Sequence, residues 1–395
     1  MIRGANASYQ LAEKSGGTAY GGMAAIDAFV KKIGLPNRID QALHLFKKHM
    51  PYHESDHVLN LAYNALCGGT SLQDIELRRN DEFFLDSIGA ERIPDPTTAG
   101  DFCRRFEPYH INRLQDAIDE DRLEVWKQQD EPFFDQATIG MDVCYKGIWG
   151  YHPLVMTLAQ TGEVLRLVNR SGNRPSQQGA ASVADKAIAL CKRAGFRKIV
   201  LRGDTAFTQT IHLDRWNKAG VKFLFGMKAY AGLVEIAENV ALSAWKPLPR
   251  APKYDPATKD RARPENVKEQ IVFERGFDNK RLCREWVTEV QYSPTDCKET
   301  YRLVIVCKEL EVTKQGRLFD DYKYFFYLTN EPTKEISTYE VVYGSNKRCD
   351  QENILSSLNQ CRALHAPVDT LESNWLLAWT ESLHVFNRWL SFALE

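Results

Sequence analysis

The sequence predicts an α/β protein in which a mixed-sheet core follows an all-helical N-terminal region and is interrupted by a β-rich insertion. Apolar residues recur with helical spacing from Ser55 to Gln129. Near Pro132 the pattern changes to the short apolar runs typical of strands, and three further such runs fall between residues 285 and 329. We therefore expect four segments: a helical region (1–130), the first part of the core (131–230), the insertion (231–333) and a helical last part of the core (334–395).

The composition is that of an ordinary globular protein. The 395 residues are 44% hydrophobic and 26% charged, and this length suggests two or three domains. The 51 Lys and Arg against 52 Asp and Glu give a net charge of −1, which excludes a uniformly basic nucleic-acid binder but not a local basic cluster. No apolar run approaches the roughly 20 residues of a membrane span. The nine cysteines form no C-x-x-C pair, which indicates reduced thiols and a cytoplasmic location.

Within the helical region, residues 94–106 form the sharpest pattern. Two prolines predict an extended lead-in and a threonine is expected to cap a short helix. That helix would carry Phe102 and Phe106 inward, with Arg104 and Arg105 outward. Short helices with a paired arginine fit a DNA reader of the helix-turn-helix type, so both arginines are candidate DNA-binding residues. A plain helical bundle with solvated arginines explains this stretch at least as well.

The core is predicted from the order of its elements. A strand at 133–141 is followed by a hairpin of two strands, 150–158 and 164–168, which completes a three-stranded meander. Helices and strands then alternate: helix 180–194, strand 198–203, helix 208–218 and strand 221–225. The order β-β-β-α-β-α-β is that of an RNase H-like fold.

Asp204 is the first candidate for a metal ligand. Ile199, Val200 and Leu201 form a short buried strand, Gly203 ends the run, and Asp204 follows directly. In an open α/β sheet, ligands bind at the carboxyl ends of the strands. A carboxylate at the end of a rigid strand is held in one position, as a metal ligand must be.

The insertion combines strand-like runs with a basic loop. The runs are residues 270–277, 285–292, 301–308 and 322–329, and the loop at 246–268 contains Lys253, Arg261 and Arg263. We predict that these three side chains contact a nucleic-acid backbone. A solvated charged loop remains the alternative.

The last helical segment contains Arg348 and Glu352. They are four residues apart and therefore share one face of a helix. Alone they would be an ordinary surface ion pair. The combination of an acid at a strand end, an acid on a late helix and a β-rich insertion between them is more informative.

With these features, the chain resembles the DDE transposases of bacterial insertion sequences, of the cut-and-paste type with an RNase H-like core and a β-rich insertion. The resemblance covers nearly the whole chain. It depends on five stretches in order: TTAGDFCRRF at 97–106, WGYHPL at 149–154, NRSGNRPS at 169–176, RGDT at 202–205 and RCDQEN at 348–353.

The resemblance implies metal-dependent cleavage and transfer of DNA strands at transposon ends. Three carboxylates would hold two Mg²⁺ (or Mn²⁺) ions, with Asp204 as the second carboxylate, Glu352 as the third and Arg348 as a phosphate contact. The implied partners are the terminal inverted repeats and the target DNA. A homodimer in a synaptic complex is implied as well, in the bacterial cytoplasm and associated with the nucleoid when bound.

The first carboxylate departs from the family pattern. Relatives have an Asp-x-Asp-Gly-Thr-like stretch on the first strand, whereas this chain offers only Asp135 and Asp142. Seven residues apart, they would face opposite ways on one regular strand, and we favour Asp142 because it is closer to the meander. The family's lysine after the glutamate is replaced by Asn359, and its tyrosine before the glutamate by Ser345. The alternative function is therefore a catalytically impaired DNA-binding relic of this family; an unrelated metal-dependent nuclease with the same fold is a third.

Overall fold

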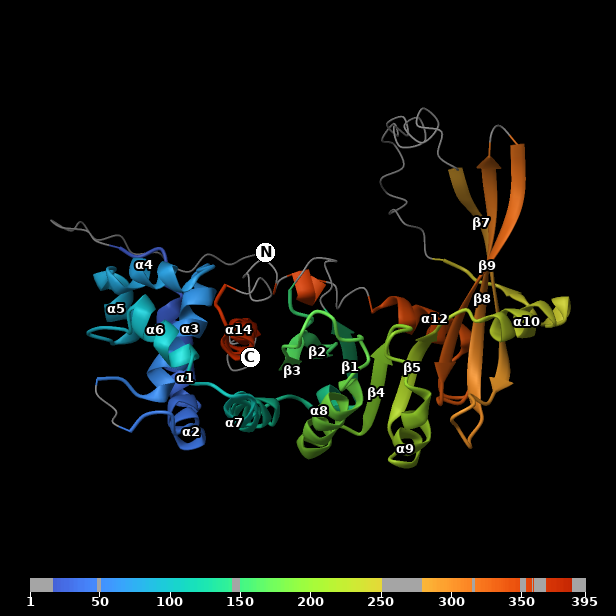
Figure 1. The fold of residues 1–395 in the computed structure, drawn as a ribbon. Helices are drawn as coiled ribbons and strands as arrows, with labels where there is room; N and C mark the ends of the chain where they lie inside the picture. Colours follow the sequence, from blue (N-terminus) through green and yellow to red (C-terminus); the bar gives the residue numbers. More distant parts are fainter. Residues whose placement is uncertain are drawn as a thin grey trace, which may run out of the picture. The chain divides into compact units, whose positions relative to one another are not determined.

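The computed structural model describes residues 17–47, 51–143, 150–250, 279–314, 317–348, 353–356, 358 and 367–385 (Figure 1). By their internal contacts the residues group into two compact units, Met1–Gln129 with Ser357–Glu395, and Asp130–Ser356. In the described residues the first unit is helical and the second contains the sheet. The finer division into four segments stays a prediction.

The helical unit is built around α3, whose side chains are buried almost throughout. This helix packs against α2, α6 and α14, so a segment from the C-terminal part of the chain completes the N-terminal bundle. The helices are α1 (Met23–Lys32), α2 (Leu35–Ala42), α3 (Glu54–Leu66), α4 (Ile75–Arg79), α5 (Glu82–Ile88), α6 (Pro96–Cys103), α7 (Pro108–Trp126) and α14 (Leu371–Glu381), with 3-10 turns at Leu72–Asp74 and Ser382–Val385.

Helix α6 begins as the prolines predict, but its cap differs from our expectation. Asp95, rather than a threonine, accepts the backbone N–H groups of Thr97 (2.9 Å) and Thr98 (3.0 Å). The carboxylate of the preceding residue satisfies both N–H groups, so a threonine cap is not needed. The predicted inward positions of Phe102 and Phe106 are confirmed, since their exposed fractions are 1% and 4%.

The second unit contains one nine-stranded sheet in the order β3-β2-β1-β4-β5-β9-β8-β7-β6. Strands β1, β4 and β5 are parallel, and β2 and β3 form the predicted antiparallel meander with β1. This arrangement confirms the predicted α/β class with an RNase H-like mixed sheet. The strands are β1 (Gln136–Val143), β2 (Leu154–Leu158), β3 (Glu163–Val168), β4 (Lys198–Gly203), β5 (Lys222–Met227), β6 (Lys246–Pro247), β7 (Asn279–Tyr292), β8 (Tyr301–Lys314) and β9 (Arg317–Thr329).

Helices cover the sheet in two places. One helix, α8, packs against β1 to β4, and another, α12, packs against β5, β7, β8 and β9. The helices of this unit are α8 (Ala180–Ala194), α9 (Leu213–Lys218), α10 (Ala231–Glu238) and α12 (Thr338–Asn346), with 3-10 turns at Glu131–Phe134, Thr210–His212 and Leu242–Ala244.

The insertion continues the core sheet. Three of its predicted strand-like runs lie within β7, β8 and β9, and β9 pairs antiparallel with β5 from Leu224↔Thr329 to Met227↔Phe326. The fourth predicted run, 270–277, falls outside the described residues. The insertion is β-rich, as expected, and its strands share backbone hydrogen bonds with the core.

An apolar cluster attaches α12 to this extended part of the sheet. It joins Val341 and Val342 of α12 to residues of the strands and of the β6 region: Leu224, Leu248, Val287, Val304 and Val306. Full burial of one such side chain contributes about 1.5–3 kcal/mol. The cluster therefore places the C-terminal end of α12 firmly against β5.

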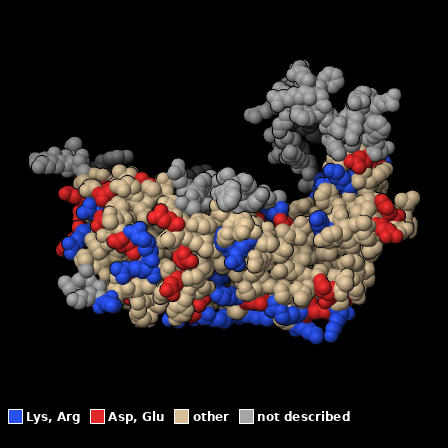
Figure 2. All heavy atoms as spheres, in the orientation of Figure 1, with Lys and Arg blue, Asp and Glu red and all other residues tan. Residues whose placement is uncertain are grey.

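Charges of both signs are interspersed on the face shown in Figure 2. The face in this view carries both signs, in agreement with the net charge of −1. Among the described residues, none of the helices has the length and apolar character needed to span a bilayer.

Candidate active site

Two aspartates lie at the ends of neighbouring parallel strands. The register of β1 with β4 runs from Gln136↔Lys198 to Met141↔Gly203. Asp142 follows Met141, and Asp204 follows Gly203. Because paired strands are about 4.8 Å apart, the two residues lie side by side at the carboxyl edge of the sheet.

The chain turns sharply after β4, and this turn orients Asp204. A Cβ on Gly203 would lie 2.9 Å from the Cβ of Phe207, so the turn folds back over the strand end where only glycine fits. Within the turn, Asp204 Oδ1 accepts the backbone N–H of Ala206 at 2.8 Å. This local hydrogen bond holds the carboxylate in one orientation.

Asp142 is nearly buried and lies beside a cation. Its exposed fraction is 8%, and Oδ1 accepts the backbone N–H of Val143 at 2.8 Å. The Nη1 atom of Arg348 lies 3.7 Å from Asp142 Oδ2. The two side chains form an ion pair that joins the end of β1 to the segment after α12.

Arg348 comes shortly after the end of α12, and a residue of β4 fixes that helix. Arg202 donates from Nη1 to the backbone oxygen of Gly344 at 3.2 Å. A Cβ on Gly344 would lie 3.3 Å from Leu224, which shows how closely the helix approaches β5. Thus β4 leads directly into Asp204 and also contains Arg202. Arg202 positions α12, and α12 leads to Arg348.

A pocket of about 390 Å³ opens beside Asp204. Its charged lining residues are Asp204, Lys228 and Arg348, and the aromatic segment 324–327 of β9 forms another wall. Burial raises the pKa of Tyr327, which hydrogen-bonds Ser345. The insertion therefore contributes directly to the surroundings of the aspartates.

The structure distinguishes the two candidates for the first carboxylate. Asp135 precedes β1 at the opposite end from Asp142, and its 65% exposed side chain pairs with Arg197. Only Asp142 lies beside Asp204. Sequence periodicity could not settle this point, because the pairing of β1 with β4 decides which end of β1 lies beside Asp204. The predicted strand 133–141 was also displaced, since residues 131–134 form a 3-10 turn and β1 extends to Val143.

Four of the predicted site residues belong to parts of the chain that the structure does not describe. Glu352 and the basic residues Lys253, Arg261 and Arg263 lie outside the described residues. Within the described ranges there is no group of three or more His, Cys, Asp or Glu side chains placed to hold a metal ion.

The paired arginines lie on the helical unit. Arg104 is exposed and pairs with Asp101, while Arg105 lies with its guanidinium carbon 5.2 Å from the ring centroid of Phe46. Arg105 also donates to the backbone oxygen of Leu45 at 3.4 Å. Both guanidinium groups are exposed, and their role in DNA binding stays a prediction.

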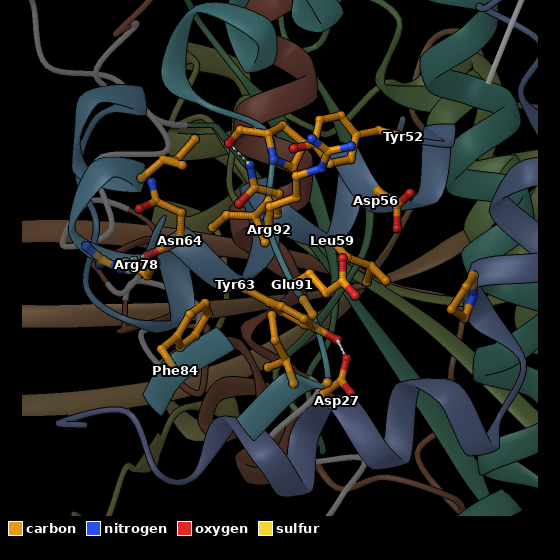
Figure 3. A pocket seen from close by; sticks show the side chains of 18 of the residues that line it. Asp27, Tyr52, Asp56, Leu59, Tyr63, Asn64, Arg78, Phe84, Glu91 and Arg92 are labelled. Atoms are coloured by element: carbon orange, nitrogen blue, oxygen red, sulfur yellow. Dashed lines mark hydrogen bonds between the residues drawn. The ribbon is translucent and has the colours of Figure 1, made fainter. Parts of the chain in front are cut away.

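A larger cavity of about 460 Å³ lies within the helical unit (Figure 3). Several of its polar groups make structural contacts: Tyr63 donates to Asp27 at 3.0 Å, and Arg78 donates to the backbone oxygens of Asn64 (3.3 Å) and Cys67 (2.9 Å). We assign this cavity no chemistry.

One residue of the pocket was missed in the sequence. Lys228 directly follows β5, in the same way that Asp204 follows β4. The rule that pointed to Asp204, that ligands meet the carboxyl ends of parallel strands, also points to Lys228.

The family model for transposase DDE domain group 1 matches residues 11–376. The chain belongs to this family. Its function is accordingly that of a DDE transposase, and DDE transposases use divalent metal ions. Among solved structures, the transposase is similar to piggyBac transposase in a synaptic complex with hairpin DNA, with 12% identity and a TM-score of 0.40 over 95% of this chain and 76% of that one. A search of curated proteins found no significant match.

Proposed function

We propose that this transposase cleaves and transfers DNA strands at transposon ends and that Asp142, Asp204 and Glu352 are its catalytic carboxylates. The observation that carries the proposal is the parallel register of β1 and β4. It brings Asp142 and Asp204 together at the edge of the sheet where an α/β fold binds its ligands. Glu352 enters from the family resemblance.

The two aspartates fit a divalent ion. Their carboxylates are hard oxygen donors of the kind that Mg²⁺ and Mn²⁺ prefer. Asp142 is the last but one residue of β1, and Asp204 directly follows β4. Asp142, Asp204 and Glu352 would together hold two ions. Bound there, the ions would supply an activated water or 3′-hydroxyl and would stabilise the leaving oxygen at a DNA phosphodiester.

Arg348 would bind a phosphate of the DNA. Its guanidinium lies next to Asp142 and lines the pocket beside Asp204. The forked N–H donors of arginine match phosphate oxygens, so one side chain can hold Asp142 and a phosphate together. This role also accounts for the anchoring of α12 by Arg202.

DNA would be held by further basic residues. We assign Arg104 and Arg105 of the helical unit, and Lys253, Arg261 and Arg263 of the insertion, to contacts with the terminal inverted repeats or the target DNA. The piggyBac structure is a synaptic complex with hairpin DNA. A homodimer that joins two transposon ends in the bacterial cytoplasm, associated with the nucleoid when bound, completes the proposal.

The test is a strand-nicking assay with the full-length chain, a duplex of the element's own terminus, and Mg²⁺ or Mn²⁺. We expect cleavage that falls at least about a hundredfold in Asp204→Asn and in Asp142→Asn. Asp135→Asn is the matched control and should cleave like the wild type. Cleavage that persists in Asp204→Asn would overturn the site assignment. Tight binding without cleavage by the wild type would support the alternative, a catalytically impaired relic.

A further inference from the structure

Lys228 lies at the same edge of the sheet as Asp204. It is the first residue after β5, and β5 runs parallel to β4 with Gly203 paired to Phe225. Asp204 and Lys228 line the same pocket of about 390 Å³. A carboxylate and an ammonium group, at the ends of two adjacent strands, therefore line the same pocket.

The surroundings leave the charge of Lys228 exposed to that space. Its side chain is exposed, and Nζ lies 5.7 Å from the ring centroid of Tyr230. No ion pair of Lys228 with a carboxylate is found among the described residues. Arg348, the other cation of the pocket, lies 3.7 Å from Asp142. An ammonium on a long flexible stem without a carboxylate partner is suited to bind an anion.

The rest of the pocket suits a nucleotide. Phe325 of β9 lines the same space, its side chain is 40% exposed, and Lys308 Nζ lies 4.8 Å from its ring centroid. Lys308 itself pairs with Glu285 at 3.4 Å. The exposed ring of Phe325 provides a surface for a sugar or base, while Lys228 in the same pocket faces a phosphate.

From this placement we propose that Lys228 binds a phosphate of the DNA strand adjacent to the phosphate that reacts. The inference deepens the proposed function and rests on it. Arg348 approaches the reacting group from α12, and Lys228 holds the neighbouring phosphate from β5. Together they fix the path of the strand over the aspartates.

The first test measures binding of the full-length chain to a labelled duplex of about 30 base pairs between 50 and 300 mM KCl. Removal of one phosphate contact lowers the slope of log Kd against log salt by about one. We expect this change, with several-fold weaker binding at low salt, in Lys228→Ala. Lys228→Arg should keep the wild-type slope. Lys222→Ala is the matched control, because Lys222 begins the same strand and lies 4.0 Å from Glu335.

The second test measures the nicking rate at saturating duplex. We expect Lys228→Ala to be at least about tenfold slower, and Lys228→Arg to recover most of the rate. An unchanged salt slope and an unchanged rate in Lys228→Ala would overturn the inference while the proposed function stands. Absence of metal-dependent cleavage by the wild type would contradict the proposed function, and the salt slope would then decide the role of Lys228. Thermal melting of each variant checks its folding.

Discussion

Arg348 and Asp142 form an ion pair, with Arg348 Nη1 3.7 Å from Asp142 Oδ2, that joins the segment after α12 to the end of β1. The pair connects two parts of the chain that are separated by the whole insertion. It makes the position of Asp142 dependent on the packing of a late helix.

Replacement of Arg348 by alanine should therefore impair chemistry more than folding. The arginine is 28% exposed but Asp142 is nearly buried, so loss of the pair should cost about 1–3 kcal/mol of unfolding free energy and leave the chain folded. Loss of a phosphate contact should slow DNA nicking on the order of a hundredfold. Arg215→Ala, which removes an exposed pair with Asp185, serves as the control. Equal nicking rates for the two variants would contradict the assigned role.

Replacement of Gly203 by alanine should disturb the Asp204 turn. The added Cβ would lie 2.9 Å from the Cβ of Phe207, closer than real contacts allow. We expect a loss of about 1–3 kcal/mol in denaturant unfolding, together with slower nicking. Gly232→Ala is the control, because nothing lies within 4 Å of its added Cβ and alanine favours a helix. A variant at Gly203 as stable as that control would show that the turn adapts.

His57 should make the helical unit sensitive to acid. Burial lowers its pKa from 6.5 to about 4, and its ring stacks on Phe102 at 4.4 Å. Between these pH values the unfolded chain binds more protons, so the unfolding free energy should fall as pH falls, by up to about 1.4 kcal/mol per unit. His57→Phe keeps an aromatic ring and should show a weaker decline from pH 7 to pH 5. Parallel curves for both proteins would disprove this assignment.

Glu381 of α14 should have the opposite effect. Burial raises the pKa of its carboxyl from 4.5 to about 9, so the folded chain keeps a proton that the unfolded chain loses. The stability that this group contributes is complete below pH 4.5 and is lost as the pH rises toward 9. Glu381→Gln should melt above the wild type at pH 8 and close to it at pH 4.5. Glu372→Gln, at the partly exposed start of the same helix, should show no such difference.

The sequence anticipated the parts of the site that depend on local pattern. An apolar run ended by glycine was enough to place Asp204 at a strand end, and the order of elements was enough to predict the fold. The choice between Asp135 and Asp142 depended on which end of β1 lies beside Asp204. Local periodicity does not determine this, since it follows from the parallel pairing of β1 with β4.

Contacts between distant segments were harder to predict. The pairing of β9 with β5 joins residues about a hundred positions apart, and no local pattern specifies the partner of an edge strand. The packing of α14 on α3, α6 and α7 likewise joins segments far apart in the sequence, and no local pattern specifies it. The rule that pointed to Asp204 also applies to Lys228, but the predicted strand 221–225 ended two residues before β5 does, at Met227.

Through the pairing of β9 with β5, the insertion also covers an edge of the core sheet. Without β9, the edge of β5 from Leu224 to Met227 would lose its backbone partners and present unpaired N–H and C=O groups. An exposed strand edge of this kind can pair with a strand of another chain. A transposase shortened in this way would lose one wall of its pocket and would also tend to aggregate.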